Sequence, residues 1–167
     1  MTLDAFAHWL GQTPFSQVVQ NVSWIIPSVQ SIHILCIAIV ISAVFMVDLR
    51  LLGVIGRDQP TAAYTSRFLS WIWPTLVLLL LSGSILIIGE PTRSLLNPAF
   101  QTKMVLLILA MITTAILQRP TFKDPAYWEL TAGHRMSARV LAVISLVLWV
   151  GIVFSGRWIA YMNTAGE

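Results

Sequence analysis

The chain has 167 residues, of which 57% are hydrophobic and only 10% are charged. Its mean hydropathy is +0.80, whereas a soluble domain usually carries about 25% charged residues. The composition therefore excludes an ordinary soluble domain and predicts that most of the surface faces lipid. The net charge of +3 is too small to indicate nucleic-acid binding, and the lone cysteine, Cys36, excludes an intrachain disulfide.

Residues 1–22, before the first long apolar run, form an interfacial segment in this interpretation. Leu3, Phe6 and Leu10 recur at helical spacing, with polar positions between them. This pattern predicts a short helix lying on the outer membrane surface, and a disordered N-terminus is the alternative. The segment lacks the basic start, apolar core and small-residue cleavage site of a signal peptide, so none is expected.

Four apolar segments are long enough to cross a bilayer, which takes about 20 residues. They cover about 24–47, 68–88, 100–117 and 140–161. Glycine and proline residues fill the connections between them. Backbone groups in lipid must be hydrogen-bonded within the segment, so each span is expected to be a helix. The sequence therefore predicts an all-α fold, a four-helix transmembrane bundle in one domain over 1–167, with a short N-terminal interfacial helix.

The basic residues near the span ends predict the orientation. Seven lie on the face that holds the first and third connections, against three on the other face: Arg50, Arg57, Arg67, Arg119, Lys123, Arg135 and Arg139, against Arg93, Lys103 and Arg157. Cytoplasmic loops carry the excess of basic residues. We therefore expect a multi-pass protein of the bacterial inner membrane with both termini in the periplasm.

His33 is the most informative polar residue within a span. It lies eight residues after Ile25, which at 1.5 Å per residue places it roughly 12 Å below the outer interface. An ionisable residue at such a depth is a functional hypothesis by default. Three interpretations remain open: a metal or haem ligand, a histidine hydrogen-bonded to a serine or carbonyl of a neighbouring helix, and a proton-transfer residue.

Other residues in the outer half of the bundle fit haem b. Small residues lie near the outer ends of two other spans, and two cations lie at the outer interface: Ser82, Gly83, Gly151, Lys103 and Arg157. His33 would be the axial iron ligand, glycines would let the macrocycle approach the backbone, and the cations would pair with propionates. Alternatively, small residues simply permit close helix packing, and cations at span ends extend toward headgroups.

No second axial ligand is assigned. His134 is predicted on the cytoplasmic face, and His8 would reach His33 only if the N-terminal helix folded over the bundle.

Asp48 and Arg50 form a second polar pair near the inner end of the first span. Residues at i and i+2 do not share a helix face, so the two are not expected to pair with each other. We expect Asp48 to form a structural clamp with Arg67 or Arg139; a catalytic role would require a cofactor on that side.

Three stretches of the sequence carry a resemblance that covers most of the chain. They are Trp24-Ile25-Ile26-Pro27 leading to Ser31-Ile32-His33, then residues 48–53, and finally Leu148-Trp149 followed by residues 156–161. Together they resemble a family of uncharacterised four-helix bacterial inner-membrane proteins, which implies the fold rather than an activity.

A fainter resemblance is to the HemJ type of protoporphyrinogen oxidase and to CopD-like membrane domains. In HemJ-type proteins an early-span histidine and a lysine opening a later span are associated with haem b, and His33 and Lys103 match these by position. The fourth span differs, and Asp48 stands where the HemJ pattern has no acid. The resemblance thus implies haem more than it implies protoporphyrinogen oxidation.

These observations predict a membrane protein that binds haem b. They do not decide whether it is an oxidoreductase. It would transfer electrons near the periplasmic face, in exchange with quinone or a periplasmic redox partner. The alternative is a cofactor-free accessory or structural subunit of a larger membrane complex. Besides the lipid bilayer, a second copy of the chain is the expected partner, because two-fold dimers are the commonest oligomers.

Overall fold

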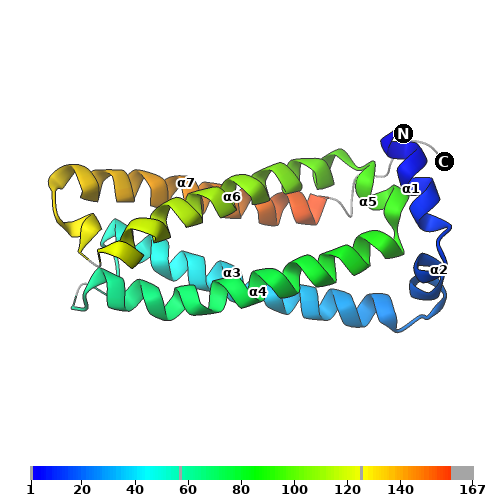
Figure 1. Cartoon of the computed structure of the whole chain (residues 1–167), viewed down its shortest axis with the longest axis horizontal. Helices are drawn as coiled ribbons and strands as arrows, with labels where there is room; N and C mark the ends of the chain where they lie inside the picture. The colour runs from blue at the N-terminus through cyan, green and yellow to red at the C-terminus, as the bar shows by residue number, and fades with distance from the viewer. Residues whose placement is uncertain (1, 57, 125, 159–167) are drawn as a thin grey trace.

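The structure is a computed structural model that describes residues 2–56, 58–124 and 126–158. These residues form helices and no strand (Figure 1). In chain order the helices are α1 (Leu3–Gly11), α2 (Pro14–Asn21), α3 (Ile25–Leu52), α4 (Thr61–Gly89), α5 (Pro91–Leu95), α6 (Pro98–Lys123), the short 3-10 helix η1 (Tyr127–Glu129) and α7 (Ala132–Trp158).

Four of the helices, α3, α4, α6 and α7, are long and apolar enough to cross a membrane. They run antiparallel, as two hairpins joined by contacts between α3 and α7 (Figure 1). The short helices α1, α2 and α5 lie at one end of the bundle, called the terminal end below. The connections from α3 to α4 and from α6 to α7 lie at the other end, called the hairpin end. The predicted four-helix membrane bundle is confirmed.

The helices extend beyond the predicted apolar spans, mainly at the hairpin end. α3 continues past Val47 through Asp48 and Arg50 to Leu52. It ends at Gly53, whose left-handed backbone (φ 76°) lets its N–H bond the carbonyls of Leu49 and Arg50. α7 begins at Ala132 rather than near Val140. Residues 159–161 of the fourth predicted span lie outside the described residues.

The N-terminal segment forms two short helices rather than one. The hydroxyls of Thr2 and Thr13 cap α1 and α2, and Pro14 occupies the first turn of α2, where it is favoured. α1 packs against α5, and α2 packs against α4. The Ser16 hydroxyl donates a hydrogen bond to the Ile88 carbonyl, at 2.5 Å. These contacts fix the segment across the terminal end of the bundle.

An apolar core occupies the middle of the bundle. Side chains from all four long helices pack there: Val40, Ala43, Val44, Leu69, Ile72, Leu76, Ala110, Trp149 and Ile152. Large apolar side chains are also exposed along the outer faces of these helices, as expected where lipid is the solvent. The apolar core separates one polar group of residues toward the terminal end from a second toward the hairpin end.

Candidate functional site

The imidazole of His33 is held by a neighbouring helix. His33 is half-buried on α3, and its Nδ1 lies 2.8 Å from the Ser82 Oγ on α4. The Ser82 hydroxyl donates its own hydrogen to the Leu78 carbonyl, at 2.7 Å. Ser82 must therefore accept from His33, so the proton of a neutral imidazole is on Nδ1. This leaves the Nε2 lone pair available as an acceptor or ligand.

Gly83 provides the space for this ring. A Cβ atom at Gly83 would lie 3.3 Å from Cε1 of His33 and 3.9 Å from its Nδ1. The first distance is tighter than ordinary van der Waals contact. The glycine therefore lets α4 approach the imidazole of α3, and in this structure His33 itself fills the space above it.

Lys103 approaches the same region from α6. It is half-buried, and its Nζ lies 3.7 Å from the position a Cβ would take on Gly156 of α7. The ammonium is close enough to His33 to act on it electrostatically. Lys103 thus places a cation near the imidazole, and Gly156 leaves room for its side chain between α6 and α7.

The remaining predicted residues lie on α7. A Cβ on Gly151 would lie 3.2 Å from a methyl group of Leu106, so Gly151 serves the packing of α6 on α7. Arg157 lies in the last turn of α7 and is exposed. The structure therefore brings His33, Ser82, Gly83 and Lys103 together, whereas Gly151 contacts Leu106 and Arg157 is exposed at the end of α7.

The other two histidines have local partners elsewhere. His8 pairs with Asp4 on the same helix, at 3.6 Å, and both side chains are exposed. His134 stacks on the Tyr127 ring at the hairpin end and bonds the Tyr127 carbonyl through Nδ1, at 3.0 Å. His33 is therefore the histidine within the bundle interior. In the part of the chain that the structure describes, no three His, Cys, Asp or Glu residues group as metal ligands; haem iron requires only one or two.

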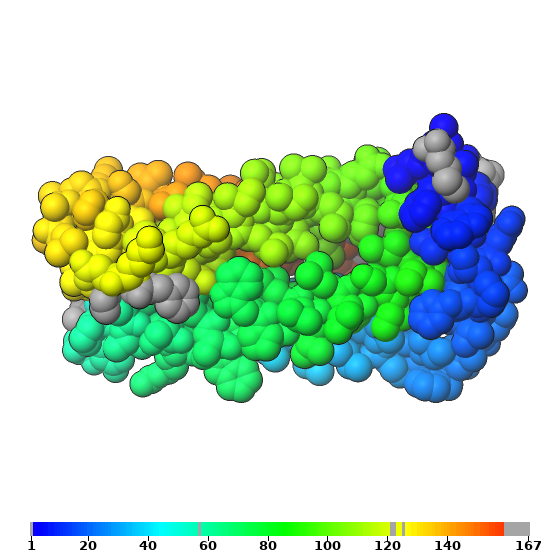
Figure 2. Space-filling model, in the orientation of Figure 1, coloured from blue at the N-terminus to red at the C-terminus, as the bar shows by residue number. Residues whose placement is uncertain are grey.

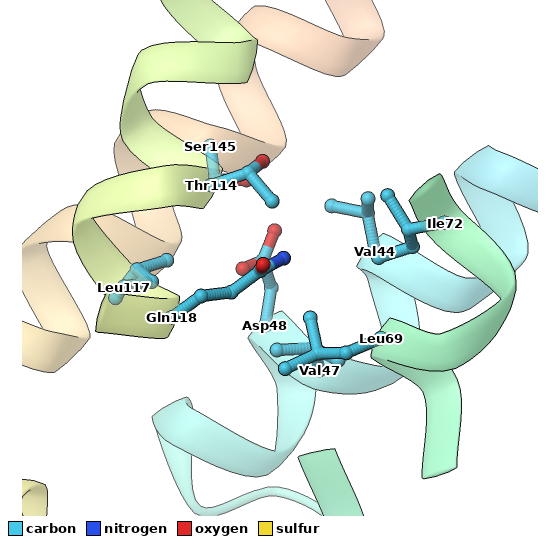
Figure 3. Close-up of a pocket in the computed structure, with 9 residues that line it drawn as sticks. All are labelled: Val44, Val47, Asp48, Leu69, Ile72, Thr114, Leu117, Gln118 and Ser145. Carbon is cyan, nitrogen blue, oxygen red and sulfur yellow. The ribbon is translucent and has the colours of Figure 1, made fainter. Parts of the chain in front are cut away.

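The predicted clamp between Asp48 and Arg67 or Arg139 is wrong. Both arginines are exposed, whereas Asp48 is buried. Asp48 lies on the inward face of α3, and the arginines lie on outward faces of α4 and α7. Figure 3 shows the carboxylate directed toward polar side chains of α6 and α7 instead. Arg50, the other member of the pair, approaches Glu129 at 3.7 Å and donates to the Gln59 carbonyl at 2.6 Å.

The residues around Asp48 form a polar cluster that the sequence analysis missed. Thr114 and Gln118 lie one turn apart on α6, and Ser145 faces Asp48 from α7 (Figure 3). The Gln118 carbonyl oxygen accepts a hydrogen bond from the Trp73 indole of α4, at 2.8 Å. The spacing of Thr114 and Gln118 in an apolar segment was the signal that could have found it, since residues at i and i+4 share a helix face.

These features define a multi-pass helical membrane protein with one histidine inside the bundle and a buried carboxylate near its other end. Residues 9–162 match DUF6644, described as a family of unknown function. The chain belongs to this family. No curated protein matches the chain, and no solved structure does.

Proposed function

We propose that this protein binds haem b through His33 and transfers electrons near the membrane face at the terminal end. Quinone or a periplasmic redox protein would be the exchange partner. The observation that carries the proposal is the hydrogen bond from His33 Nδ1 to Ser82, which leaves Nε2 as the free lone pair.

The chemistry of haem ligation supports this assignment. A ligating histidine normally donates its other ring N–H to a fixed acceptor, which sets the tautomer and the ring orientation. Ser82 is such an acceptor, and the Leu78 carbonyl fixes its hydroxyl. Lys103 would pair with a propionate. Haem would supply one-electron redox chemistry, and the chain would orient it and shield it within the bilayer.

The helix arrangement offers a way for a flat ligand to enter. α4 and α6 make little contact with each other, whereas α3–α4, α6–α7 and α3–α7 are packed pairs. Figure 2 shows a groove between α4 and α6, through which part of α7 is visible. A macrocycle entering between the two hairpins would approach His33 without disrupting either hairpin.

A reduced-minus-oxidised absorption spectrum tests the proposal directly. Protein from haem-replete cells should show a Soret band, and His33→Ala should abolish it or greatly lower it while the protein still inserts. His8→Ala and His134→Ala are matched controls and should leave the spectrum unchanged. A wild-type protein without a Soret band would reject haem binding, and loss of haem in His134→Ala would show that the ligand is wrong.

The same spectrum also tests whether Lys103 and Arg157 help to hold the haem. Lys103→Ala and Arg157→Ala should lower haem content less than His33→Ala, because each removes one contact to a propionate rather than the iron bond. Equal loss in all three variants would contradict these roles.

The competing proposal is a cofactor-free accessory subunit of a larger membrane complex. The same His33–Ser82 hydrogen bond favours it, because such a bond between helices also stabilises packing in a membrane. In that case the wild-type protein carries no haem, and His33→Ala changes only stability.

The proposed location is the bacterial inner membrane, with the terminal end toward the periplasm, supported by the excess of basic residues at the hairpin end. Asp58→Cys in a Cys36→Ala background tests the orientation, because residue 58 is exposed in the first connection. An impermeant thiol reagent should leave it unlabelled in intact cells and label it after lysis. Labelling in intact cells would reverse the orientation.

A homodimer is the proposed assembly, because closed two-fold symmetry is the commonest arrangement of identical subunits. Native mass spectrometry from lipid discs should show two copies. A monomer under the same conditions would contradict it.

A further inference from the structure

A buried carboxyl group lies in a mostly apolar cavity near the hairpin end of the bundle. Asp48 of α3 shares this cavity, of about 10 Å³, with Thr114 and Gln118 of α6 and Ser145 of α7 (Figure 3). Each of the four is at most 8% exposed. The rest of the lining is apolar: Val44, Val47, Leu69, Ile72 and Leu117. The Asp48 side chain is therefore shielded from water, with three polar side chains beside it.

Asp48 has no counter-ion among the described residues, and it is the only titratable side chain among those that line the cavity. Arg50, on the same helix, is directed to Glu129 and Gln59. The basic residues at this end of the other helices are exposed: Arg67 of α4, Arg119 and Lys123 of α6, and Arg135 and Arg139 of α7. An unpaired carboxylate is costly in a membrane interior, and such a group takes up a proton instead. The surroundings of Asp48 therefore favour the neutral carboxyl.

The three polar neighbours each present a hydrogen-bond donor without a partner. The atoms are Thr114 Oγ1, Gln118 Nε2 and Ser145 Oγ, and Asp48 Oδ2 is likewise unpaired. The Gln118 oxygen is held by the Trp73 indole, so the amide presents its N–H groups to the cavity. Donors bond an ionised carboxylate more strongly than a neutral group. The same cluster can therefore stabilise the ionised form when these side chains close on the carboxylate.

The hydroxyls of Thr114 and Ser145 are free to change their role. Many other hydroxyls in the long helices donate to a carbonyl one turn earlier: Ser31, Thr65, Ser66, Ser70, Thr75, Ser82, Ser84, Thr102 and Thr113. Thr114 and Ser145 make no such bond. A hydroxyl accepts as well as donates, and its hydrogen rotates. It can therefore accept from a protonated carboxyl or donate to an ionised one.

We infer that Asp48 is a site of reversible proton binding. In the protonated form, the carboxyl O–H donates to the oxygen of Ser145, which faces it from α7. On ionisation the O–H bond breaks, the proton passes to water, and the electron pair stays on the carboxylate, which accepts from Thr114 and Gln118. A metal ion would require more oxygen ligands than the cavity offers, whereas a proton requires one.

The hairpin end is the nearer source of protons. Asp48 lies four residues before Leu52, the last residue of α3, so about 6 Å of helix separates it from that end. The apolar core lies on its other side. Proton exchange therefore takes place with the membrane face at the hairpin end.

Infrared spectroscopy tests the inference, because the C=O stretching band of a protonated carboxyl differs from the bands of a carboxylate. The full chain in lipid discs should show this band at neutral pH. The band should shift in D₂O and disappear reversibly as the pH is raised. Asp48→Asn should lack it, whereas Asp58→Asn, which changes an exposed acid, should keep it. His33→Ala should also keep it, so the test does not depend on the proposed haem.

Variants of the hydroxyls test their separate roles. Thr114→Val should raise the pH at which the band disappears by about one unit, the scale of one hydrogen bond to a charged group, because the ionised form loses a donor. Thr113→Val is the matched control and should keep the wild-type titration, since its hydroxyl bonds Leu109. Ser145→Ala should move the band to higher frequency, because the protonated carboxyl loses its acceptor.

Three results would overturn the inference. The first is a wild-type protein without the band at neutral pH, and the second is a band that survives in Asp48→Asn. The third is a band that persists at every pH at which the protein stays folded, because Asp48 would then hold its proton permanently. An unchanged titration in Thr114→Val would contradict the role of its hydroxyl as a donor.

Discussion

The two polar regions of the bundle satisfy their hydrogen bonds in opposite ways. Near the terminal end, His33 donates to Ser82 and Ser82 donates to Leu78, so each polar hydrogen has a partner. Near the hairpin end, Asp48, Thr114, Gln118 and Ser145 gather around a cavity with atoms left unpaired. The apolar core lies between the two regions.

This difference separates a polar region whose hydrogen bonds are made within the chain from one that keeps unpaired polar atoms buried. Around His33, hydrogen bonds to Ser82 and Leu78 fix one ring nitrogen, so a substitution there removes a stabilising contact. Around Asp48, the hydroxyls of Thr114 and Ser145 are buried without a hydrogen-bond partner, so replacing one with an apolar group removes a cost. Substitutions at the two regions should therefore change stability with opposite signs.

The largest effect is expected from Gly83→Val. The new side chain would occupy the space of the His33 imidazole, which already lies 3.3 Å from the Cβ position. Such overpacking costs typically about 1–3 kcal/mol, so the free energy of unfolding in detergent should fall by that amount, and any bound haem should be lost. Gly133→Val is the control, because its Cβ would meet only Thr131 Oγ1, at 3.8 Å. Equal effects at both glycines would contradict a specific contact with His33.

Ser82→Ala should have a smaller destabilising effect. It removes the acceptor for the His33 N–H and leaves that group half-buried without a partner, at a cost of about 1–2 kcal/mol. Ser84→Ala tests only the loss of a hydroxyl bonded to its own helix, at Leu80, and should be close to neutral. Chemical unfolding of the two variants in the same detergent gives the comparison. If Ser84→Ala lowers the free energy of unfolding as much as Ser82→Ala does, the hydrogen bond between His33 and Ser82 does not contribute to stability.

Thr114→Val should show the smallest effect, and with the opposite sign. It replaces an unpaired buried hydroxyl with a methyl group of similar shape, which removes a desolvation cost. The free energy of unfolding should rise by about 1 kcal/mol, whereas Thr113→Val, which loses a bond to Leu109, should not be stabilised. Chemical unfolding in detergent gives the comparison, and destabilisation of Thr114→Val would mean that the hydroxyl already has a partner in the folded protein.

The sequence by itself determined the class of the protein. Low charge and four long apolar runs require helices in lipid, since backbone groups there find partners only within the segment. His33 also stood out in sequence, because an ionisable residue in a span is rare and its depth follows from the 1.5 Å rise per residue. Glycine and proline residues also predicted the connections, and in the structure Gly53 and Pro60 flank the connection from α3 to α4.

The tertiary structure decided which polar groups meet. Asp48 could be placed near the end of a span from sequence, but its partner depended on the rotation of α3 relative to α6 and α7. A rotation of 100° separates consecutive residues, so apolar runs without a strong pattern do not define the inward face. For the same reason Gly83 and Ser82 could be grouped with His33 by depth, yet only the packing of α3 on α4 showed that the serine holds the ring and the glycine accommodates it.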